Sequence, residues 1–251
     1  MEEENYLLVS DDGPGFYTLE GEGELIGRPS VFLRLFGCNL TCKGWATKDS
    51  PWGCDSFISW SMKNKYTFDE MFDFYEKNGL VDHLANGAVW KITGGEPMLR
   101  QEPILKFIKS FAAKYRFQPI VDVETNGTIV PDPQWIAWPL NATFTVSPKM
   151  ANNGDPEEKR YKKDALAWHV KNDSCFKFVI NTPEDLEELY AKYINEPDVR
   201  VSKSRIWLMV MAGSRVEHIE RAEAVASLCK EHCFNFSPRL QLVLWDKALK
   251  V

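Results

Sequence analysis

The chain has 251 residues, of which 44% are hydrophobic and 26% are charged, and this composition excludes a largely disordered protein. Its 36 acidic and 30 basic side chains give a formal charge of −6, so no general positive field would attract nucleic acid or anionic lipid. We therefore expect a folded globular protein without a direct nucleic-acid partner.

The beginning of the chain has no feature of an export signal. Residues 1–10 carry three consecutive glutamates and lack a basic segment followed by an apolar run. No stretch of the chain reaches the length of a membrane span. We therefore expect a cytoplasmic protein whose 6 cysteines stay reduced and can serve as metal ligands, reactive groups or core residues.

Short apolar runs alternate with amphipathic segments along the chain. The runs are rich in β-branched and aromatic residues, which predicts buried strands at 31–36, 88–93, 120–124, 142–146, 176–180 and 206–210. Helices are predicted between them at 67–78, 103–115, 183–193 and 216–232. Thr67 and Thr182 occupy expected N-cap positions, and Thr67 with Glu70 matches a capping box.

This alternation predicts an α/β fold with a parallel sheet and right-handed crossovers, in one domain over residues 1–251. Six strands are too few for a closed eightfold barrel, so the sheet is either open and doubly wound or an incomplete barrel. The most polar stretch, 152–163, is predicted to be a solvated excursion. In such folds the loops at the carboxyl ends of the strands build the active site, and the informative motifs of this chain fall there.

Three cysteines follow the first predicted strand on one loop, 37–56. Cys38 and Cys42 are close in sequence, and Cys54 comes after eleven intervening residues. A structural zinc site normally has a fourth ligand nearby. Three thiolates with one open position suit a 4Fe-4S cluster whose fourth iron binds a small molecule. The alternative is a set of unpaired buried cysteines.

Polar clusters also follow the next three predicted strands, at 94–97, 122–128 and 146–149. In the first of them, Gly94 and Gly95 would let a ligand approach the backbone, and Glu96 could accept a hydrogen bond from an amine. Each cluster alone could be a turn. Four successive polar strand ends are hard to attribute to turns, and they predict a shared site.

In content and order, these motifs resemble the radical S-adenosylmethionine superfamily. The segments 16–23, 31–38, 124–128, 146–149 and 237–245 resemble the 7-carboxy-7-deazaguanine synthase family, and the likeness runs from about Gly13 to the C-terminus. The resemblance implies an incomplete (β/α) barrel of about six parallel strands. It also implies a lyase that converts 6-carboxy-5,6,7,8-tetrahydropterin to 7-carboxy-7-deazaguanine, with loss of ammonia, on the way to queuosine-type bases.

The resemblance implies a role for each matching residue. The 4Fe-4S ligands would be Cys38, Cys42 and Cys54, and Ser56 would bind Mg2+ in an Asp55-Ser56 pair where the family usually has Asp-Thr. S-adenosylmethionine would be bound by Gly94, Gly95, Glu96, Thr125, Asn126, Ser147 and Lys149. Substrate would be bound by Thr18, Glu20, Glu22, Arg34 and Gln241, the last within a substrate-side segment at 234–251. No residue is assigned as a general acid or base.

The resemblance further implies a reducing partner such as flavodoxin and a homodimer. A structural ion pair is the alternative for Arg34, and an ordinary turn is the alternative for Ser56. The sequence departs from the family pattern by the insertion at 43–53, by Gln241 in place of a usual histidine, and at 209–213.

Three cysteines lie outside these motifs. Cys229 and Cys233 are one helical turn apart beside His232, which would allow a metal pair, but core positions are the simpler interpretation. Cys175 is predicted to be a core residue. Rival functions for the whole chain are a glycyl-radical activase, against which the segment 18–23 argues, and a non-catalytic iron-sulfur or zinc protein.

Overall fold

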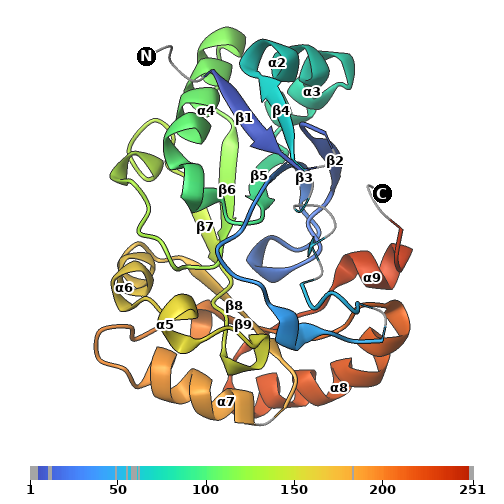
Figure 1. Ribbon diagram of the computed structural model, residues 1–251, viewed down its shortest axis with the longest axis vertical. Coiled ribbons are helices and arrows are strands. Elements are labelled where there is room, and N and C mark those ends of the chain that lie inside the picture. The colour runs from blue at the N-terminus through green and yellow to red at the C-terminus, as the bar shows by residue number, and fades with distance from the viewer. Residues whose placement is uncertain are drawn as a thin grey trace.

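The computed structural model describes residues 5–10, 13–48, 50–54, 56–57, 61, 63–182 and 184–248. A ten-stranded sheet runs through these residues in the order β10-β9-β8-β7-β6-β5-β3-β1-β4, and β2 pairs with β3 (Figure 1). The strands are β1 (Tyr6–Val9), β2 (Phe16–Leu19), β3 (Pro29–Leu35), β4 (Asn64–Thr67), β5 (Val89–Gly94), β6 (Ile120–Thr125), β7 (Thr143–Val146), β8 (Cys175–Ile180), β9 (Ile206–Val210) and β10 (Asn235–Ser237).

The six predicted strands correspond to β3 and to β5 through β9. Parallel pairing begins between β3 and β5, with Val31 opposite Trp90, and continues from each strand to the next as far as β10. The strand order ends at β10 on one side and at β4 on the other, so the sheet is not closed. The prediction of an α/β fold with an incomplete barrel is therefore confirmed.

Four short strands were not predicted. β1 pairs antiparallel with both β3 and β4, and β2 pairs antiparallel with β3. β10 adds only three residues, Asn235–Ser237, to the parallel edge. Each of these strands is too short to produce a clear alternation of apolar and polar residues.

The helices cover the outside of the curved sheet, as Figure 1 shows for α4 and for α6 through α8. The α-helices are α2 (Phe68–Lys77), α3 (Leu80–Ala85), α4 (Gln101–Tyr115), α5 (Glu157–Arg160), α6 (Lys163–Lys171), α7 (Glu184–Leu189), α8 (Arg215–His232) and α9 (Leu240–Trp245). Single turns are η1 (Gly23–Leu25), η2 (Lys43–Trp45), η3 (Pro97–Arg100), η4 (Pro133–Trp135), η5 (Ala151–Asn153) and η7 (Lys203–Arg205), and a π-helical turn, η6 (Tyr190–Ile194), extends α7. No helix of the described residues is both long and apolar enough to cross a membrane.

The predicted capping box is present at the start of α2. The Thr67 backbone N–H donates to Glu70 Oε2 at 2.7 Å, and the Glu70 N–H donates to Thr67 Oγ1 at 3.3 Å. The predicted cap at Thr182 adjoins Pro183, which lies outside the described residues, as does Asp55 of the predicted Asp55-Ser56 pair.

Aromatic side chains fill the core between the first half of the sheet and helices α2 and α4. Trp90 of β5 lies 4.6 Å from Phe111 of α4, measured between ring centroids, and both side chains are fully buried. The Trp90 indole N–H donates to the hydroxyl of Tyr75 at 3.0 Å. This packing holds β5 and its carboxyl end in a fixed position.

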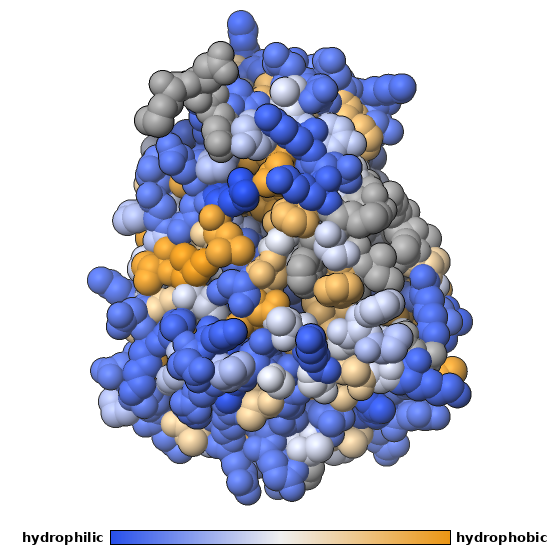
Figure 2. Space-filling model, viewed as in Figure 1, coloured by the Kyte–Doolittle hydropathy of each residue, from blue (hydrophilic) through white to orange (hydrophobic). Residues whose placement is uncertain are grey.

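The prediction that 152–163 is a solvated excursion holds for most of the segment, because seven of its twelve residues are exposed, but three of its polar residues are buried. Asn153 is fully buried, Asp155 is 9% exposed and Arg160 is 5% exposed. These three side chains are buried because they hydrogen-bond to other parts of the chain, and a sequence pattern does not reveal such partners. On the visible face in Figure 2, hydrophilic side chains cover the two ends of the molecule, and apolar side chains gather in a band between them.

Candidate active site

A cavity of about 510 Å³ lies where the carboxyl ends of the parallel strands meet. Its volume is in the range of ordinary ligand sites. The predicted site residues that line it are Thr18, Glu20, Glu22, Arg34, Cys38, Cys42, Cys54, Ser56, Gly94, Gly95, Thr125, Asn126, Ser147, Lys149 and Gln241. The remaining predicted residue, Glu96, is 2% exposed and is not among the residues that line the cavity.

The ends of β3 and β5 are joined by backbone hydrogen bonds that bring two motifs together. The Gly95 N–H donates to Leu35 O at 3.0 Å, and the Glu96 N–H donates to Gly37 O at 2.8 Å. A Cβ on Gly95 would lie 1.8 Å from Gly37 O, so only glycine fits at this position. The cysteine loop and the turn at 94–97 therefore form one wall of the cavity.

The three cysteines of the loop all reach this cavity. Burial raises the pKa of the Cys38 thiol to about 11 and also raises the pKa of Cys42. The Leu40 N–H points at Cys38 Sγ, 3.5 Å away. Among the described residues, no three His, Cys, Asp or Glu side chains converge on one metal ion. A 4Fe-4S cluster binds each thiolate through a different iron, so it does not need such convergence.

Glu96 holds the neighbouring strand end in place. Its Oε1 accepts from Thr125 Oγ1 at 2.7 Å and from the Met98 N–H at 2.9 Å. Its Oε2 accepts from the Asn126 N–H at 2.7 Å. Burial raises the pKa of Glu96, although these hydrogen bonds act in the opposite direction. The carboxyl group thus links the ends of β5 and β6.

Lys149 and Asn126 bring polar groups to the same side of the cavity. Lys149 Nζ donates to the Ser147 hydroxyl and to the Ser147 carbonyl, each at 2.8 Å, and lies 5.0 Å from the ring centroid of Trp45. Asn126 Nδ2 donates to Asn39 Oδ1 at 2.8 Å. Backbone and side-chain groups from β6, β7 and the cysteine loop therefore surround one part of the cavity.

Charged side chains pair on the opposite side of the cavity. Glu22 Oε2 lies 2.6 Å from Lys177 Nζ, and Glu22 Oε1 lies 3.0 Å from Arg239 Nε. Gln241 Nε2 donates to the same Oε1 at 2.7 Å, and Lys177 also pairs with Glu124 at 2.7 Å. Burial would raise the pKa of Glu22, but the charges of Lys177 and Arg239 hold it far below its usual range. Glu22 is therefore a permanent anion.

A second group of charged side chains, Lys91, Asp122 and Glu20, is more deeply buried than the group around Glu22. Lys91 Nζ contacts Asp122 Oδ2 at 2.7 Å and Glu20 Oε2 at 3.0 Å, and all three side chains are nearly inaccessible to solvent. Burial raises the pKa of Glu20 despite the charge of Lys91. The interior of the incomplete barrel thus carries alternating charges rather than an apolar filling.

Arg34 extends from β3 to the cavity beside the stacked rings of Phe16 and Phe32, whose centroids are 5.3 Å apart. Its guanidinium carbon lies 5.6 Å from the ring centroid of Phe16 and 5.8 Å from that of Phe32. The guanidinium lies at the cavity wall, where it can pair with a carboxylate.

The loop that follows β2 contacts the C-terminal segment at one side of the cavity. The Gly23 N–H donates to Ser237 Oγ at 2.8 Å, and the Leu240 N–H donates to Gly21 O at 2.9 Å. A Cβ on Gly21 would lie 1.9 Å from Gln241 Oε1. Residues 237–241 are therefore held against the loop at 21–23, and α9 lies next to α8 in Figure 1.

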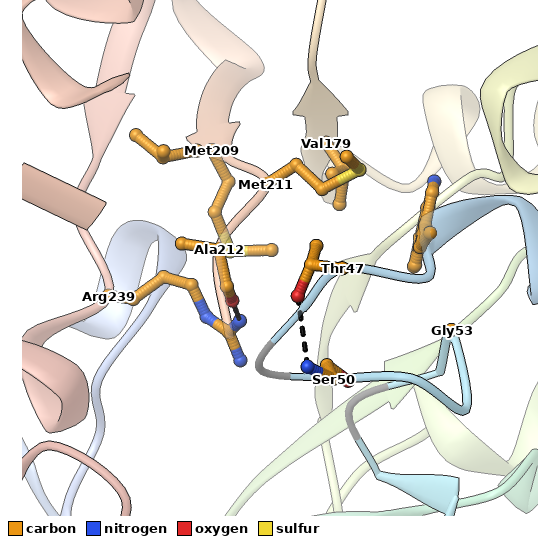
Figure 3. Close-up of a pocket in the computed structure, with 10 residues that line it drawn as sticks. Thr47, Ser50, Gly53, Val179, Met209, Met211, Ala212 and Arg239 are labelled. Atoms are coloured by element: carbon orange, nitrogen blue, oxygen red, sulfur yellow. Dashed lines mark hydrogen bonds between the residues drawn. The ribbon is translucent and has the colours of Figure 1, made fainter. Parts of the chain in front are cut away.

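The insertion at 43–53 packs beside this closure. Figure 3 shows Thr47, Ser50 and Gly53 facing Met211 and Ala212 across a small cavity of about 30 Å³. The Ser50 N–H donates to Thr47 Oγ1 at 2.9 Å and stabilises the turn of the insertion. Two departures from the family pattern, 43–53 and 209–213, therefore face each other.

Several cavity residues were not predicted as site residues, among them Lys177, Glu124 and Arg239. The signal for two of them is visible in the sequence, because Lys177 and Glu124 interrupt apolar strands at positions that face the barrel interior. Arg239 lies in the segment 237–245 that carries the family resemblance, but its pairing with Glu22 is not visible in the sequence because the two residues are distant.

The three remaining cysteines lie away from the cavity walls. Cys175 and Cys229 are buried, and Cys229 Sγ donates to Asn235 O at 3.4 Å. Cys233 is exposed at the end of α8 with a φ of 59°. The predicted core positions are therefore confirmed for Cys175 and Cys229, whereas the core prediction is wrong for Cys233, which caps α8.

Comparison with known proteins gives consistent matches over almost the whole chain. The 7-carboxy-7-deazaguanine synthase of Halobacterium salinarum is 31% identical, and the match covers 94% of this chain and 93% of the relative. That of Pyrobaculum aerophilum is 30% identical, with 93% of each chain covered. The crystal structure of QueE from Escherichia coli matches with a TM-score of 0.59 at 20% identity, covering 94% of this chain and 98% of QueE. No family model matches the chain.

Proposed function

Since the chain belongs to the 7-carboxy-7-deazaguanine synthase family, we propose that the 510 Å³ cavity is the active site of a radical S-adenosylmethionine lyase. Its reaction converts 6-carboxy-5,6,7,8-tetrahydropterin to 7-carboxy-7-deazaguanine with loss of ammonia, in the biosynthesis of queuosine-type bases. The observation that carries this assignment is the meeting of three thiols, a glycine turn and paired charges at one set of strand ends. Family membership argues against a glycyl-radical activase and against a non-catalytic iron-sulfur or zinc protein.

The donor set fits a 4Fe-4S cluster. Cys38, Cys42 and Cys54 would bind three of its irons and leave the fourth open, beside the turn at Gly94 and Gly95. When bound, the cluster and S-adenosylmethionine supply a radical that takes a hydrogen atom from the pterin. The residues around them bind, orient and exclude water.

S-adenosylmethionine would lie against the ends of β5, β6 and β7. The backbone of Gly94 and Gly95 allows its close approach, and Glu96 either binds its amine or positions Thr125 and Asn126 for that purpose. Ser147 and Lys149 form the remainder of this subsite.

The pterin would lie between β3 and the C-terminal segment. Arg34 would pair with its carboxylate, while Glu22 and Gln241 would bind its N–H groups with Thr18 and Glu20 nearby. Burial would raise the pKa of Glu124, but the charge of Lys177 lowers it, so Glu124 is ionised and can accept a hydrogen bond from bound substrate.

A magnesium ion would bind at Ser56, whose hydroxyl lines the cavity next to Cys54. Mg2+ prefers oxygen ligands and takes few of them from protein, so one hydroxyl with substrate and water is sufficient.

Further proposals concern the whole chain. We propose a single domain over 1–251, which the continuous ten-stranded sheet supports. A reducing partner such as flavodoxin is required because the chemistry begins with one external electron. A homodimer and a cytoplasmic location, where thiols stay reduced, complete the proposal.

The ligand assignment can be tested by anaerobic reconstitution with iron and sulfide. Cys54→Ala should lose the 4Fe-4S absorbance and the reductive cleavage of S-adenosylmethionine, because only two thiolates would remain. Cys229→Ala is the matched control and should retain both, since Cys229 lies in the core beneath β10. The opposite pattern would contradict the assignment.

A Ser56→Ala variant that needs no more magnesium than the wild type would contradict the magnesium site.

A further inference from the structure

Asp155, which follows η5, hydrogen-bonds to the cysteine loop from the opposite side of the cavity wall. Its Oδ2 accepts from the backbone N–H groups of Thr41 and Cys42, each at 2.9 Å. Its Oδ1 accepts from Thr41 Oγ1, also at 2.9 Å. Asp155 is only 9% exposed, so most water is excluded from these hydrogen bonds.

The backbone at Cys42 needs such support. Cys42 has φ 50° and ψ 34°, in the left-handed region that residues with a Cβ adopt at a cost of about 1–3 kcal/mol. The N–H groups of Thr41 and Cys42 both point at Asp155 Oδ2, so one carboxylate oxygen accepts from both. A negative charge is the strongest acceptor for two converging N–H groups.

Asn153 fixes the orientation of Asp155. The fully buried Asn153 side chain accepts from the Asp155 N–H at 2.9 Å and donates to Asp155 Oδ2 at 2.8 Å. Its Nδ2 also lies 3.6 Å from Cys42 Sγ. The carboxylate is therefore preoriented, and the same amide that orients it contacts the thiol.

A second contact holds the insertion against the same segment. The Trp45 indole N–H donates to Asn152 Oδ1 at 2.8 Å, and Asn152 Nδ2 donates to Val179 O at 2.9 Å. A Cβ on Gly44 would lie 2.3 Å from Asn152 O, so the two backbones are in close contact. The loop is thus attached to β8 through Asn152.

We propose that Asp155 is a positioning residue that holds the backbone of Thr41 and Cys42 in the shape required for cluster binding before iron is present. This role rests on the proposed function in that it takes Cys42 as a cluster ligand. The carboxylate acts through two backbone N–H groups and the Thr41 hydroxyl, and Asp155 is not among the residues that line the cavity.

The test uses the full-length protein without iron, under reducing conditions. Asp155→Ala should accelerate amide hydrogen exchange at Thr41 and Cys42 and the alkylation of Cys42 by iodoacetamide. The expected factor is at least about tenfold, which corresponds to the loss of one hydrogen bond to a charged group. Asp155→Asn keeps one oxygen acceptor and should show a smaller acceleration. Asp164→Ala, an exposed aspartate in the first turn of α6, is the matched control and should keep wild-type rates.

Thr41→Val provides an independent test if Asp155→Ala does not fold, as judged by circular dichroism. It removes only the bond between Thr41 Oγ1 and Asp155, so a modest acceleration confined to the loop is expected. Wild-type exchange and alkylation rates in both Asp155→Asn and Thr41→Val, or in a folded Asp155→Ala, would overturn the positioning role.

Iron content separates this inference from the proposed function. After reconstitution, the wild type should bind a full cluster, and Asp155→Ala should bind less iron and lose it faster to a chelator. A wild type that binds no cluster would contradict the proposed function, while the exchange rates would still decide the role of Asp155. If the wild type and Asp155→Ala retain iron equally and exchange amide hydrogens at equal rates, the positioning role of Asp155 is overturned and the proposed function is not affected.

Discussion

At the scale of single residues, the paired charges of the cavity are the feature that points most clearly to ligand binding rather than to core packing. Glu22 contacts Lys177 and Arg239 while its side chain is only 13% exposed. Charges buried in this way do not contribute much net stability, but removing one partner leaves the others without compensation. We therefore expect these paired charges to serve ligand binding rather than the stability of the fold.

Replacing Glu22 by glutamine tests this view of the charges. Because Arg239 would lose its carboxylate partner and Lys177 would keep only Glu124, Glu22→Gln should lower the free energy of unfolding by roughly 3 kcal/mol. Urea unfolding measures the change. Glu24→Gln is the control, since its partner Arg205 is at the surface and the loss should stay below about 1 kcal/mol. Equal small losses in both variants would show that Glu22 is not held as described.

Arg34 is expected to discriminate between the two ligands of the cavity. Arg34→Ala should weaken binding of the carboxylated pterin about tenfold or more and leave S-adenosylmethionine binding nearly unchanged, because a guanidinium pairs with the pterin carboxylate. Isothermal titration calorimetry of each ligand measures this difference. Arg34→Lys keeps the charge but not the planar guanidinium, so its affinity for the pterin should fall between those of the wild type and Arg34→Ala. Equal loss of both ligands would identify Arg34 as a structural residue.

How far the site could be predicted depends on where its signals lie in the sequence. The cysteines and the glycine turn are local motifs, and they line the cavity together. Asp155 gave no such signal, because its partners Thr41 and Cys42 are distant in sequence and a polar segment with buried partners looks like an exposed one.

At the scale of elements, the parallel strands were predictable because both faces of each are buried, which produces continuous apolar runs. The added antiparallel strands are four residues long and partly exposed in β2 and β4, so their composition is not distinctive. The contact between the insertion and η5 could not be predicted at all, since it depends on how two loops meet.

Gly44→Ala tests that contact between loops. The new Cβ would lie 2.3 Å from Asn152 O and would force η2 away from η5. Trypsin should then cleave at Lys43 and Lys48 several-fold faster than in the wild type, with the products identified by mass spectrometry. Ala46→Ser, at an exposed position of the same loop, should be cleaved at the wild-type rate. An unchanged rate in Gly44→Ala would mean that the insertion does not pack as described.

At the scale of the whole molecule, a buried histidine should make stability depend on pH. His169 is fully buried, its Nδ1 lies 3.1 Å from Ser174 Oγ, and burial lowers its pKa to about 3. Between about 6.5 and 3 the unfolded chain takes up a proton at His169 and the folded chain does not, so stability is lost as the pH falls.

The loss from this single group should approach about 1.4 kcal/mol per pH unit below its unfolded pKa. Urea unfolding between pH 4.5 and 6.5 measures it, above the range in which most carboxylates titrate. His169→Gln cannot take up this proton, so it should reduce the slope by that amount. An equal slope in both proteins would show that His169 is not a buried neutral group.

Formation of 7-carboxy-7-deazaguanine by the reconstituted protein is the most direct test of the proposed active site. The wild type should be incubated anaerobically with dithionite, S-adenosylmethionine, magnesium and 6-carboxytetrahydropterin, and the products followed by mass spectrometry. We predict both 5′-deoxyadenosine and 7-carboxy-7-deazaguanine with the wild type and neither with Cys54→Ala. Formation of 5′-deoxyadenosine without the deazaguanine, from a protein that holds an intact cluster, would contradict the assigned reaction.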